Sequence, residues 1–313
     1  MLFDKVAIIG VGLIGSSLAR VIRHNHLAKV ITGFDNNPEY LCKAKEIGVI
    51  DEAFESAAGA AADADLVVLA TPVGAYSAIS AEIVPVMKKG AVITDVGSVK
   101  KYATAEIEKH IPSESGIVYV PGHPVAGTEK SGPEAGFLEL FEGRWCILTP
   151  GKFATPEATV KVSAMWQAAK MKIDTMTPEH HDKVMAAVSH LPHLIAFSIV
   201  GTVADLEGYE KQEIIKYSAS GFRDFTRIAG SDPTMWRDIL LNNKETILEL
   251  IQRFVEDLIA LQRNIRWDEG DRLFELFSRT QKIRKEVIEA KQDQPETEKK
   301  ILAELSRENS LDK

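Results

Sequence analysis

The chain has 313 residues, a length that suits two domains better than one. Its formal net charge of −8 argues against a nucleic-acid partner, which would call for a basic face. We identify no apolar run of the about 18 residues that a membrane span requires, and no secretory signal. The two cysteines, Cys42 and Cys146, form no CxxC pattern, so we expect a cytoplasmic protein without a thiol metal site.

The first half alternates apolar, strand-like runs with helix-like segments. Strands are expected, in chain order, at 5–10, 30–35, 66–72, 91–97, 117–122 and 144–150. Helices are expected between them at 13–24, 38–47, 75–87 and 100–109. Continuous apolar strands separated by helices are typical of a parallel sheet covered on both faces, so we predict an α/β domain over 1–152. A strand near 170–176 could close this sheet.

The second half, 153–313, is predicted to be helical. The stretch 178–206 is too apolar for a helix with one wet face, which indicates burial in a bundle or a subunit interface. The stretch 231–265 has a helical period and begins with Ser231 or Asp232 as its cap. The charged stretch 281–313 is expected to be exposed helix that frays into disorder.

A glycine motif, GxGxxG, lies in IIGVGLIGSS between the first predicted strand and helix. Gly10 would allow the tight turn, Gly12 the approach of a pyrophosphate, and Gly15 close helix–strand packing. Asp35, twenty residues after Gly15, would bind the adenosine ribose and repel a 2′-phosphate, which favours NAD over NADP. A plain glycine turn without a ligand is the alternative. Further cofactor contacts are expected from Leu13, Ile14, Thr71 and Pro72.

The run GHPVAGTEKSG at 122–132 surrounds His123 with glycines and a proline, so we expect a loop there. Ligands of a parallel sheet bind beyond the carboxyl ends of its strands, where His123 and Ser98 would reach one small molecule. A histidine there can accept a hydroxyl proton as hydride leaves the same carbon, and Ser98 could orient the hydroxyl or the imidazole. The alternative is a histidine that satisfies loop backbone groups.

The helical half contributes two more polar clusters. His190 and His193 in SHLPH share a helix face, which Pro192 is expected to distort. Spacing places no third or fourth metal ligand, so we predict no metal; contact with an anionic substrate is favoured, and a buried structural role stays open for His190. In GFRDFTRIAG, an arginine could bind a carboxylate in a paired fashion, or Arg223 and Asp224 could form a cap network.

Together these segments resemble the prephenate/arogenate dehydrogenase family of tyrosine biosynthesis. The resemblance rests on GVGLIGSS, ATPVGAY, DVGSVK, PGHPVAGTEKSGPEAG, SHLPH and DFTRIAGSDPTMWRDI. It implies an N-terminal Rossmann NAD-binding domain followed by an all-helical C-terminal domain that binds substrate and pairs two chains as a homodimer. It further implies NAD-dependent oxidative decarboxylation of prephenate to 4-hydroxyphenylpyruvate, of arogenate to tyrosine, or of both.

The resemblance also implies roles for individual residues. His123 matches the catalytic histidine that draws the proton from the 4-hydroxyl, and Ser98 the serine that aligns it. Arg227 matches the arginine that holds a substrate carboxylate, and His193 the histidine at the side-chain end of the substrate. Further family positions are matched by Glu129 and Asp224 in a gating ion network, and by Thr128 and Trp236 in the pocket lining. No chorismate mutase extension and no ACT regulatory module are expected.

Two other classes of protein remain open from the residues alone. A dehydrogenase of the β-hydroxyacid dehydrogenase or imine reductase type has a similar two-domain plan, but would be expected to use a lysine on a long helix. A non-catalytic NAD sensor would keep the glycine motif without needing His123, Ser98 and Arg227 together. The sequence does not rank prephenate against arogenate.

Overall fold

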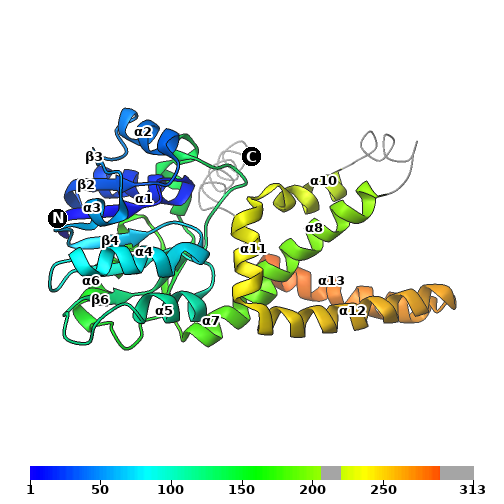
Figure 1. The fold of residues 1–313 in the computed structure, drawn as a ribbon. Helices are drawn as coiled ribbons and strands as arrows, with labels where there is room; N and C mark the ends of the chain where they lie inside the picture. The colour runs from blue at the N-terminus through cyan, green and yellow to red at the C-terminus, as the bar shows by residue number, and fades with distance from the viewer. Residues whose placement is uncertain (206–219, 290–313) are drawn as a thin grey trace, which may run out of the picture. The chain divides into compact units, whose positions relative to one another are not determined.

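The computed structural model describes residues 1–205 and 220–289. Contacts divide the chain into a unit of Met1–Ile247 and a unit of Leu248–Lys313. The first unit contains both β-sheets, the helices that cover them, and the helices α7, α8, α10 and α11 (Figure 1). The two units are described separately.

A six-stranded parallel sheet forms the centre of the first unit, in the order β3-β2-β1-β4-β5-β6. Its strands are β1 Phe3–Ile9, β2 Ala28–Phe34, β3 Glu52–Ala53, β4 Leu66–Leu69, β5 Val92–Asp95 and β6 Val118–Val120. The strand order reverses between β1 and β4, which is where dinucleotide-binding sheets open a crevice at their carboxyl ends. The predicted Rossmann architecture is therefore present, and it includes a short edge strand, β3, that was not predicted from the sequence.

Helices cover both faces of this sheet. They are α1 Leu13–His24, α2 Pro38–Glu46, α3 Ala57–Ala61, α4 Tyr76–Ile83, α5 Lys100–Glu108 and α6 Pro156–Ala168. One buried core joins the sheet to α1 and α6 through Leu18, Ile22 and Trp166. The other joins it to α3, α4 and α5 through Ala60, Ile79 and Ile107. Burial on both faces accounts for the continuous apolar strands in the sequence.

A second sheet of three strands differs from the sequence prediction. It consists of β7 Gly122–Pro124, β8 Trp145–Leu148 and β9 Lys172–Thr175. The strand expected near 170–176 forms, but it pairs with β8 and does not extend the six-stranded sheet. His123, expected in a loop, lies in β7 opposite Ile147. The expected strand 117–122 breaks at Pro121, which has no N–H for a ladder, and the edge of β8 then takes up β7.

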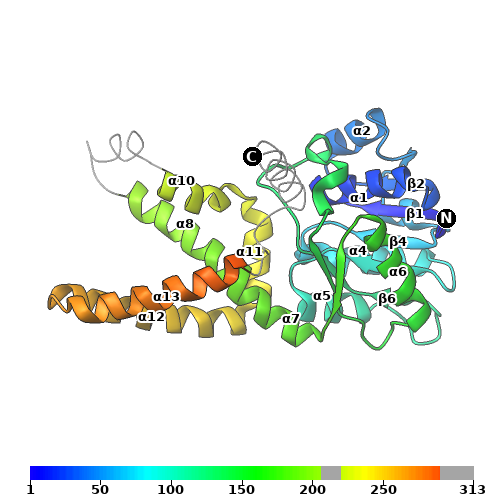
Figure 2. The same ribbon diagram turned by 180° about the vertical axis from the view of Figure 1, so that it is seen from behind.

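The apolar stretch predicted at 178–206 is helical from Pro178 to Ala204, with an irregular centre. It comprises α7 Pro178–Met185, a π-helical turn at Ala186–His190 and α8 Leu191–Ala204 (Figure 2). Pro192 lies in the first turn of α8, where it donates no N–H to the preceding carbonyls, and the wider turn just before it accommodates this loss. The distortion expected at Pro192 is therefore a π turn.

The single helix predicted over 231–265 is wrong, because the chain breaks at Asn243. The structure has α10 Ser220–Thr226, a 3₁₀ turn at Arg227–Gly230, α11 Pro233–Asn242, α12 Lys244–Arg266 and α13 Gly270–Glu289. The Asn243 amide donates to the Asp182 carbonyl at 2.9 Å and to His190 Nδ1 at 3.3 Å. These tertiary contacts, which periodicity does not reveal, accompany the break. Asp232 caps α11 as expected, by accepting from Met235 N at 2.8 Å. Residues 290–313 of the predicted tail lie outside the described residues.

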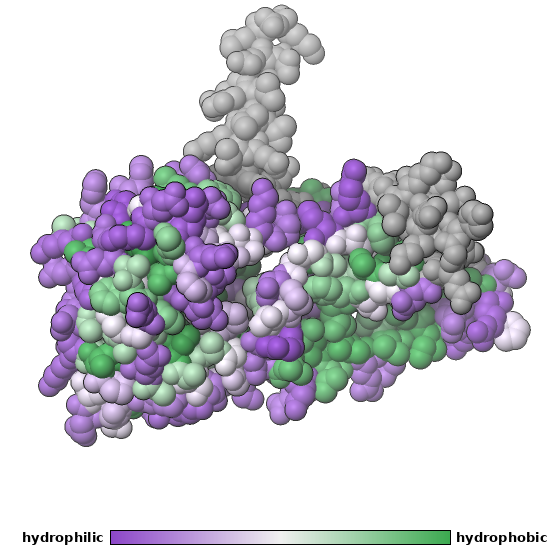
Figure 3. Space-filling model, turned by 45° about the horizontal axis from the view of Figure 1, so that its top comes forward, coloured by the Kyte–Doolittle hydropathy of each residue, from purple (hydrophilic) through white to green (hydrophobic). Residues whose placement is uncertain are grey.

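The helical region exposes much apolar surface. Pro178–Ala204 is long and apolar enough to cross a membrane by length and composition, although only 22% of its most apolar window is buried. The expectation that no apolar run is long enough for a membrane span is therefore wrong. His190, Pro192 and His193 interrupt this stretch, but the mean hydropathy of its most apolar window is still 1.6. One such helix is weak evidence for a membrane span. Apolar side chains gather over the helices on the right of Figure 3.

Candidate active site

The glycine turn after β1 has the geometry that its spacing predicts. Gly10 has φ +97°, and a Cβ there would lie 2.6 Å from the Ala70 carbonyl oxygen. A Cβ on Gly15 would clash with the Gly10 carbonyl, so α1 packs directly on the turn. Larger residues at these two positions would separate the strand, the turn and the helix.

The start of α1 fits an anionic group. Its N-cap residue, Gly12, has no side chain that could cap the helix, and no acidic residue occupies the first turn. A Cβ on Gly12 would meet nothing within 4 Å, so the space before the helix is open. The first N–H groups of a helix lack helical partners and favour negative charge. Leu13 and Ile14 begin this helix half-buried, and Thr71 and Pro72 follow the neighbouring strand β4.

Asp35 lies directly after β2 and beside the glycine turn. Its Oδ2 accepts from Val11 N at 2.8 Å and its Oδ1 from Asn37 N at 2.9 Å. Each carboxylate oxygen can accept a further hydrogen bond, so Asp35 can still receive ribose hydroxyls. The residues present therefore fit a dinucleotide.

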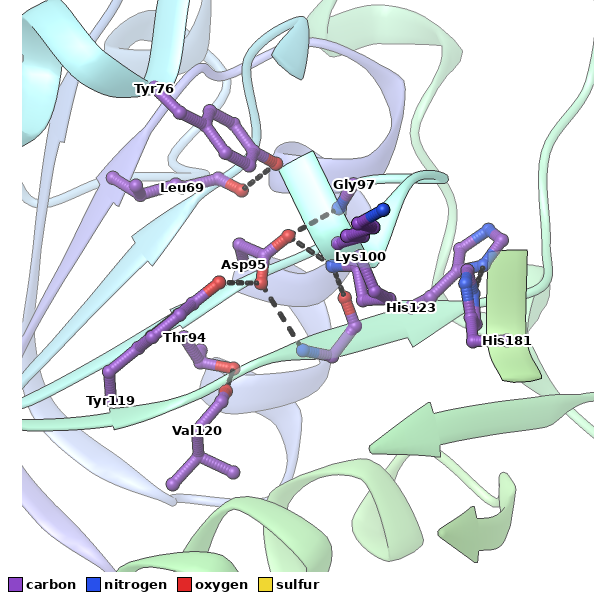
Figure 4. Close-up of polar contacts among 12 residues, drawn as sticks. Leu69, Tyr76, Thr94, Asp95, Gly97, Lys100, Tyr119, Val120, His123 and His181 are labelled. Atoms are coloured by element: carbon purple, nitrogen blue, oxygen red, sulfur yellow. Dashed lines mark hydrogen bonds and ion pairs between the residues drawn. The ribbon is translucent and has the colours of Figure 1, made fainter. Parts of the chain in front are cut away.

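His123 belongs to a chain of three buried side chains. Its Nδ1 lies 2.8 Å from Nε2 of His181, whose Nδ1 lies 2.8 Å from Oδ1 of Asp182. The exposed fractions are 7% for His123, 0% for His181 and 3% for Asp182. Figure 4 shows the two imidazoles joined by this contact, with their ring planes 67° apart and His181 contributed by α7. His181 and Asp182 are not among the residues predicted from the sequence, because both lie within the polar run EHHDK at 179–183 and nothing local distinguishes them from their neighbours.

A buried ion pair supports the strand that carries His123. Lys100, at the start of α5, contacts the Asp95 carboxylate and donates to the Gly122 carbonyl at 2.6 Å (Figure 4). Tyr119 Oη donates to Asp95 Oδ1 at 2.9 Å. Both charged side chains are fully buried. The network joins β5, β6 and α5 to the residue next to His123.

His123 is neutral at physiological pH. Burial lowers its pKa well below the usual 6.5, and the nearby His181, Lys100 and His190 act in the same direction. The neutral form has one nitrogen that can accept a proton, which is the state that a general base needs.

His193 and Trp236 form a stacked pair on the helical side. Their ring centroids are 3.7 Å apart, with 21° between the planes. His193 Nδ1 donates to the Ser189 carbonyl at 2.8 Å, which leaves its Nε2 as an acceptor. His190 is fully buried, and burial lowers its pKa to about 4. Buried nitrogens of His190 (Nε2) and Trp236 (Nε1) have no hydrogen-bond partner within residues 1–205 and 220–289.

The remaining predicted residues are only partly brought together. Arg227, which begins the 3₁₀ turn, pairs with Glu129 at 3.3 Å, and both side chains are exposed. Asp224 contacts Arg223 at 4.0 Å and does not join that pair, so the two acids are not in one network here. Thr128 is exposed and its hydroxyl accepts from Lys130 N at 3.2 Å. Ser98 is half-buried, and no hydrogen bond from its hydroxyl to His123 is found in the described part of the chain.

Two family profiles match most of the chain. The profile for the prephenate dehydrogenase nucleotide-binding domain matches residues 18–175, and that for the prephenate dehydrogenase dimerization domain matches residues 177–279. The chain belongs to the prephenate dehydrogenase family. This membership does not favour the β-hydroxyacid dehydrogenase and imine reductase alternatives.

Known members of the prephenate dehydrogenase family are similar to this chain along most of their length. A cyclohexadienyl dehydrogenase of Zymomonas mobilis is 38% identical over 90% of the chain and 95% of its own length. A prephenate dehydrogenase of Bacillus subtilis is 35% identical over 88% and 73%, respectively. The solved prephenate dehydrogenase of Aquifex aeolicus, in complex with hydroxyphenyl propionate and NAD⁺, is 37% identical, covers 91% of this chain and 98% of its own, and has a TM-score of 0.82.

Proposed function

We propose that the chain is an NAD-dependent oxidoreductase that oxidatively decarboxylates prephenate, arogenate or both, with His123 as the base. The observation that carries the proposal is the buried imidazole of His123, whose Nδ1 is paired with His181 and whose strand β7 directly follows the carboxyl end of β6 in the sheet that presents the dinucleotide turn. The family assignment and the relatives named above supply the substrate class.

The chain's residues have defined tasks in this reaction. His123 takes the proton of the ring hydroxyl on its free Nε2. The ring carboxylate leaves as CO₂ and its bonding electrons stay in the ring, which becomes an aromatic phenolate that takes the proton back from His123. NAD, when bound, supplies the acceptor for the hydride that the hydroxyl-bearing carbon loses. The product is 4-hydroxyphenylpyruvate from prephenate or tyrosine from arogenate. Ser98 would hold the hydroxyl oriented toward the imidazole.

Cofactor binding is assigned to the glycine turn and its neighbours. Gly10, Gly12 and Gly15 would receive the pyrophosphate at the start of α1, with Asp35 on the ribose hydroxyls. The Asp35 carboxylate would repel a 2′-phosphate, so NAD is favoured over NADP. Secondary contacts are assigned to Leu13, Ile14, Thr71 and Pro72.

Substrate binding is assigned to the helical side. Arg227 would exchange its Glu129 partner for a substrate carboxylate, because a guanidinium binds either acid through paired hydrogen bonds. His193 would contact the substrate side chain, with Trp236 stacked behind it. Thr128 and Asp224 would line the entrance.

We further propose a cytoplasmic homodimer. Exposed apolar side chains of α8, α12 and α13 would pair with a second copy, which supports the assignment of the helical region to dimerisation. We place the end of the nucleotide-binding domain after β9, because α6 shares the core of the six-stranded sheet and β9 pairs with β8. This extends the predicted 1–152 domain through the strand near 170–176.

Steady-state rates with prephenate and arogenate, each with NAD and NADP, test the proposal. We expect turnover with at least one substrate and a preference for NAD. Replacing His123→Asn should leave the NAD dissociation constant unchanged and lower kcat by about 10²–10⁴, the usual contribution of a general base. His24→Asn, at the exposed end of α1, is the matched control. Turnover of neither substrate by the unmodified chain would overturn the proposal.

A further inference from the structure

We infer that His181 and Asp182 are positioning residues that determine which nitrogen of His123 is free to accept a proton. The inference rests on the proposed function, because it concerns the base of that reaction. It follows from the hydrogen-bond chain that runs from Asp182 through His181 to His123.

Asp182 lies at the buried end of this hydrogen-bond chain, and its carboxylate can only accept hydrogen bonds. Lys100 N donates to its Oδ1 at 2.7 Å and Lys101 N donates to its Oδ2 at 3.0 Å. These are the first two N–H groups of α5, whose own N-cap residue, Val99, supplies no side-chain cap. A carboxylate from α7 therefore caps α5, where the helix dipole also favours negative charge.

The acceptor at Asp182 sets the direction of every hydrogen bond that follows. His181 Nδ1 must donate to it. Burial lowers the pKa of His181, so its ring is neutral and its Nε2 has only a lone pair. His123 Nδ1, 2.8 Å from that lone pair, must then carry the proton, and Nε2 of His123 is left bare. Nε2 is the nitrogen with no partner in the described residues.

The same chain supports the charge that His123 gains. Lys100 and His190 face His123 and oppose its protonation, while Asp95 is already paired with Lys100. Within residues 1–205 and 220–289, Asp182 is therefore the anion placed to stabilise the imidazolium, and it acts through the polarised ring of His181. Neither positioning residue needs to touch the substrate.

Histidine nitrogen NMR on ¹⁵N-labelled protein without ligands reads the proton positions directly. In the unmodified chain, we expect Nδ1 of His123 to be protonated and Nε2 to be bare. In Asp182→Asn, one amide oxygen cannot serve three donors. The two backbone N–H groups must remain donors, so the proton of His181 should move from Nδ1 to Nε2. His123 Nδ1 would then accept, and the proton of His123 should move to its Nε2. A protonated Nε2 of His123 in the unmodified chain would overturn the inference.

Kinetics supply the second arm. His181→Leu removes the acceptor for His123 Nδ1, so kcat should fall by about thirtyfold or more while the substrate KM stays within about threefold. His181→Gln retains an oxygen of similar reach and should recover most of kcat. His180→Leu, at the exposed neighbouring histidine, should change neither. Equal kcat for His181→Leu and the unmodified chain would contradict the positioning role.

The two arms separate this inference from the proposed function. If the unmodified chain turned over neither substrate, the proposed function would fail, yet the NMR readout would still decide the proton positions. If turnover were normal but Nε2 of His123 carried the proton in the unmodified chain, the proposed function would stand and the positioning role of His181 and Asp182 would be wrong.

Discussion

Lys100 is a fully buried cation whose ammonium contacts one carboxylate and one carbonyl, from Asp95 and Gly122. A buried charge is tolerated when it is paired and its remaining hydrogen bonds are made, whereas the loss of one partner leaves the other desolvated and unpaired. Because the pair holds Gly122, its integrity fixes the position of His123 as well as the stability of the sheet.

Replacing Lys100→Met should therefore lower the free energy of unfolding by about 3–5 kcal/mol, because the Asp95 carboxylate stays buried without its cation. Urea denaturation measures this directly. Lys101→Met is the matched control. The Lys101 side chain is exposed and makes only a 3.9 Å contact with Glu245, so its loss should change the free energy of unfolding by no more than about 0.5 kcal/mol. Similar losses in both variants would show that the buried pair contributes nothing specific.

At the scale of the element, α1 combines two different demands on glycine. Gly15 is needed because α1 packs on the Gly10 carbonyl, whereas Gly12 has open space around it and an ordinary, negative φ of −68°. Gly15 therefore serves packing, and Gly12 leaves room at the start of the helix. The two substitutions should thus separate folding from cofactor binding.

Gly12→Ala should leave the melting temperature nearly unchanged and weaken NAD binding about tenfold or more, because its methyl group occupies the approach to the first N–H groups. Gly15→Ala should instead destabilise the fold, with a lower melting temperature in the absence of NAD. Thermal melts and NAD titration followed by fluorescence measure the two effects. Tight NAD binding by Gly12→Ala would place the pyrophosphate elsewhere.

The elements that the sequence predicted well are those with local causes. The bounds of α1, residues 13–24, follow from its glycine turn and its periodicity. The errors have tertiary causes. His123 lies in β7 because β8 offers a free edge, and the helix predicted over 231–265 breaks where Asn243 binds Asp182 and His190. The His181–Asp182 pair was missed because its partner, the start of α5, is far away in the sequence.

At the scale of the whole molecule, the exposed apolar side chains call for an explanation. Large apolar residues with 44–74% exposure on α12 and α13 include Val255, Leu258, Ile259, Phe274 and Phe277. Contiguous exposed apolar surface on a globular chain commonly marks an interface. The proposed homodimer would cover it.

Phe274→Glu should raise the dimer dissociation constant about tenfold or more, because an unpaired carboxylate would be buried at the interface. Sedimentation velocity at several concentrations measures the change. Gln281→Glu adds the same charge at an exposed position of α13 and serves as the control. An unchanged constant for Phe274→Glu would remove this part of α13 from the interface.

The placement of His123 in β7 has a practical consequence for redesign. The proposed base is held by the pairing of β7 with β8 and by its imidazole partner, while the segment from Gly127 to Ser131 is exposed. Grafting that segment from relatives with other substrate preferences would alter the exposed surface that follows β7 and leave the proposed proton acceptor in register. Swapped loops could then be ranked by selectivity alone, with the chemistry of each chimera held constant.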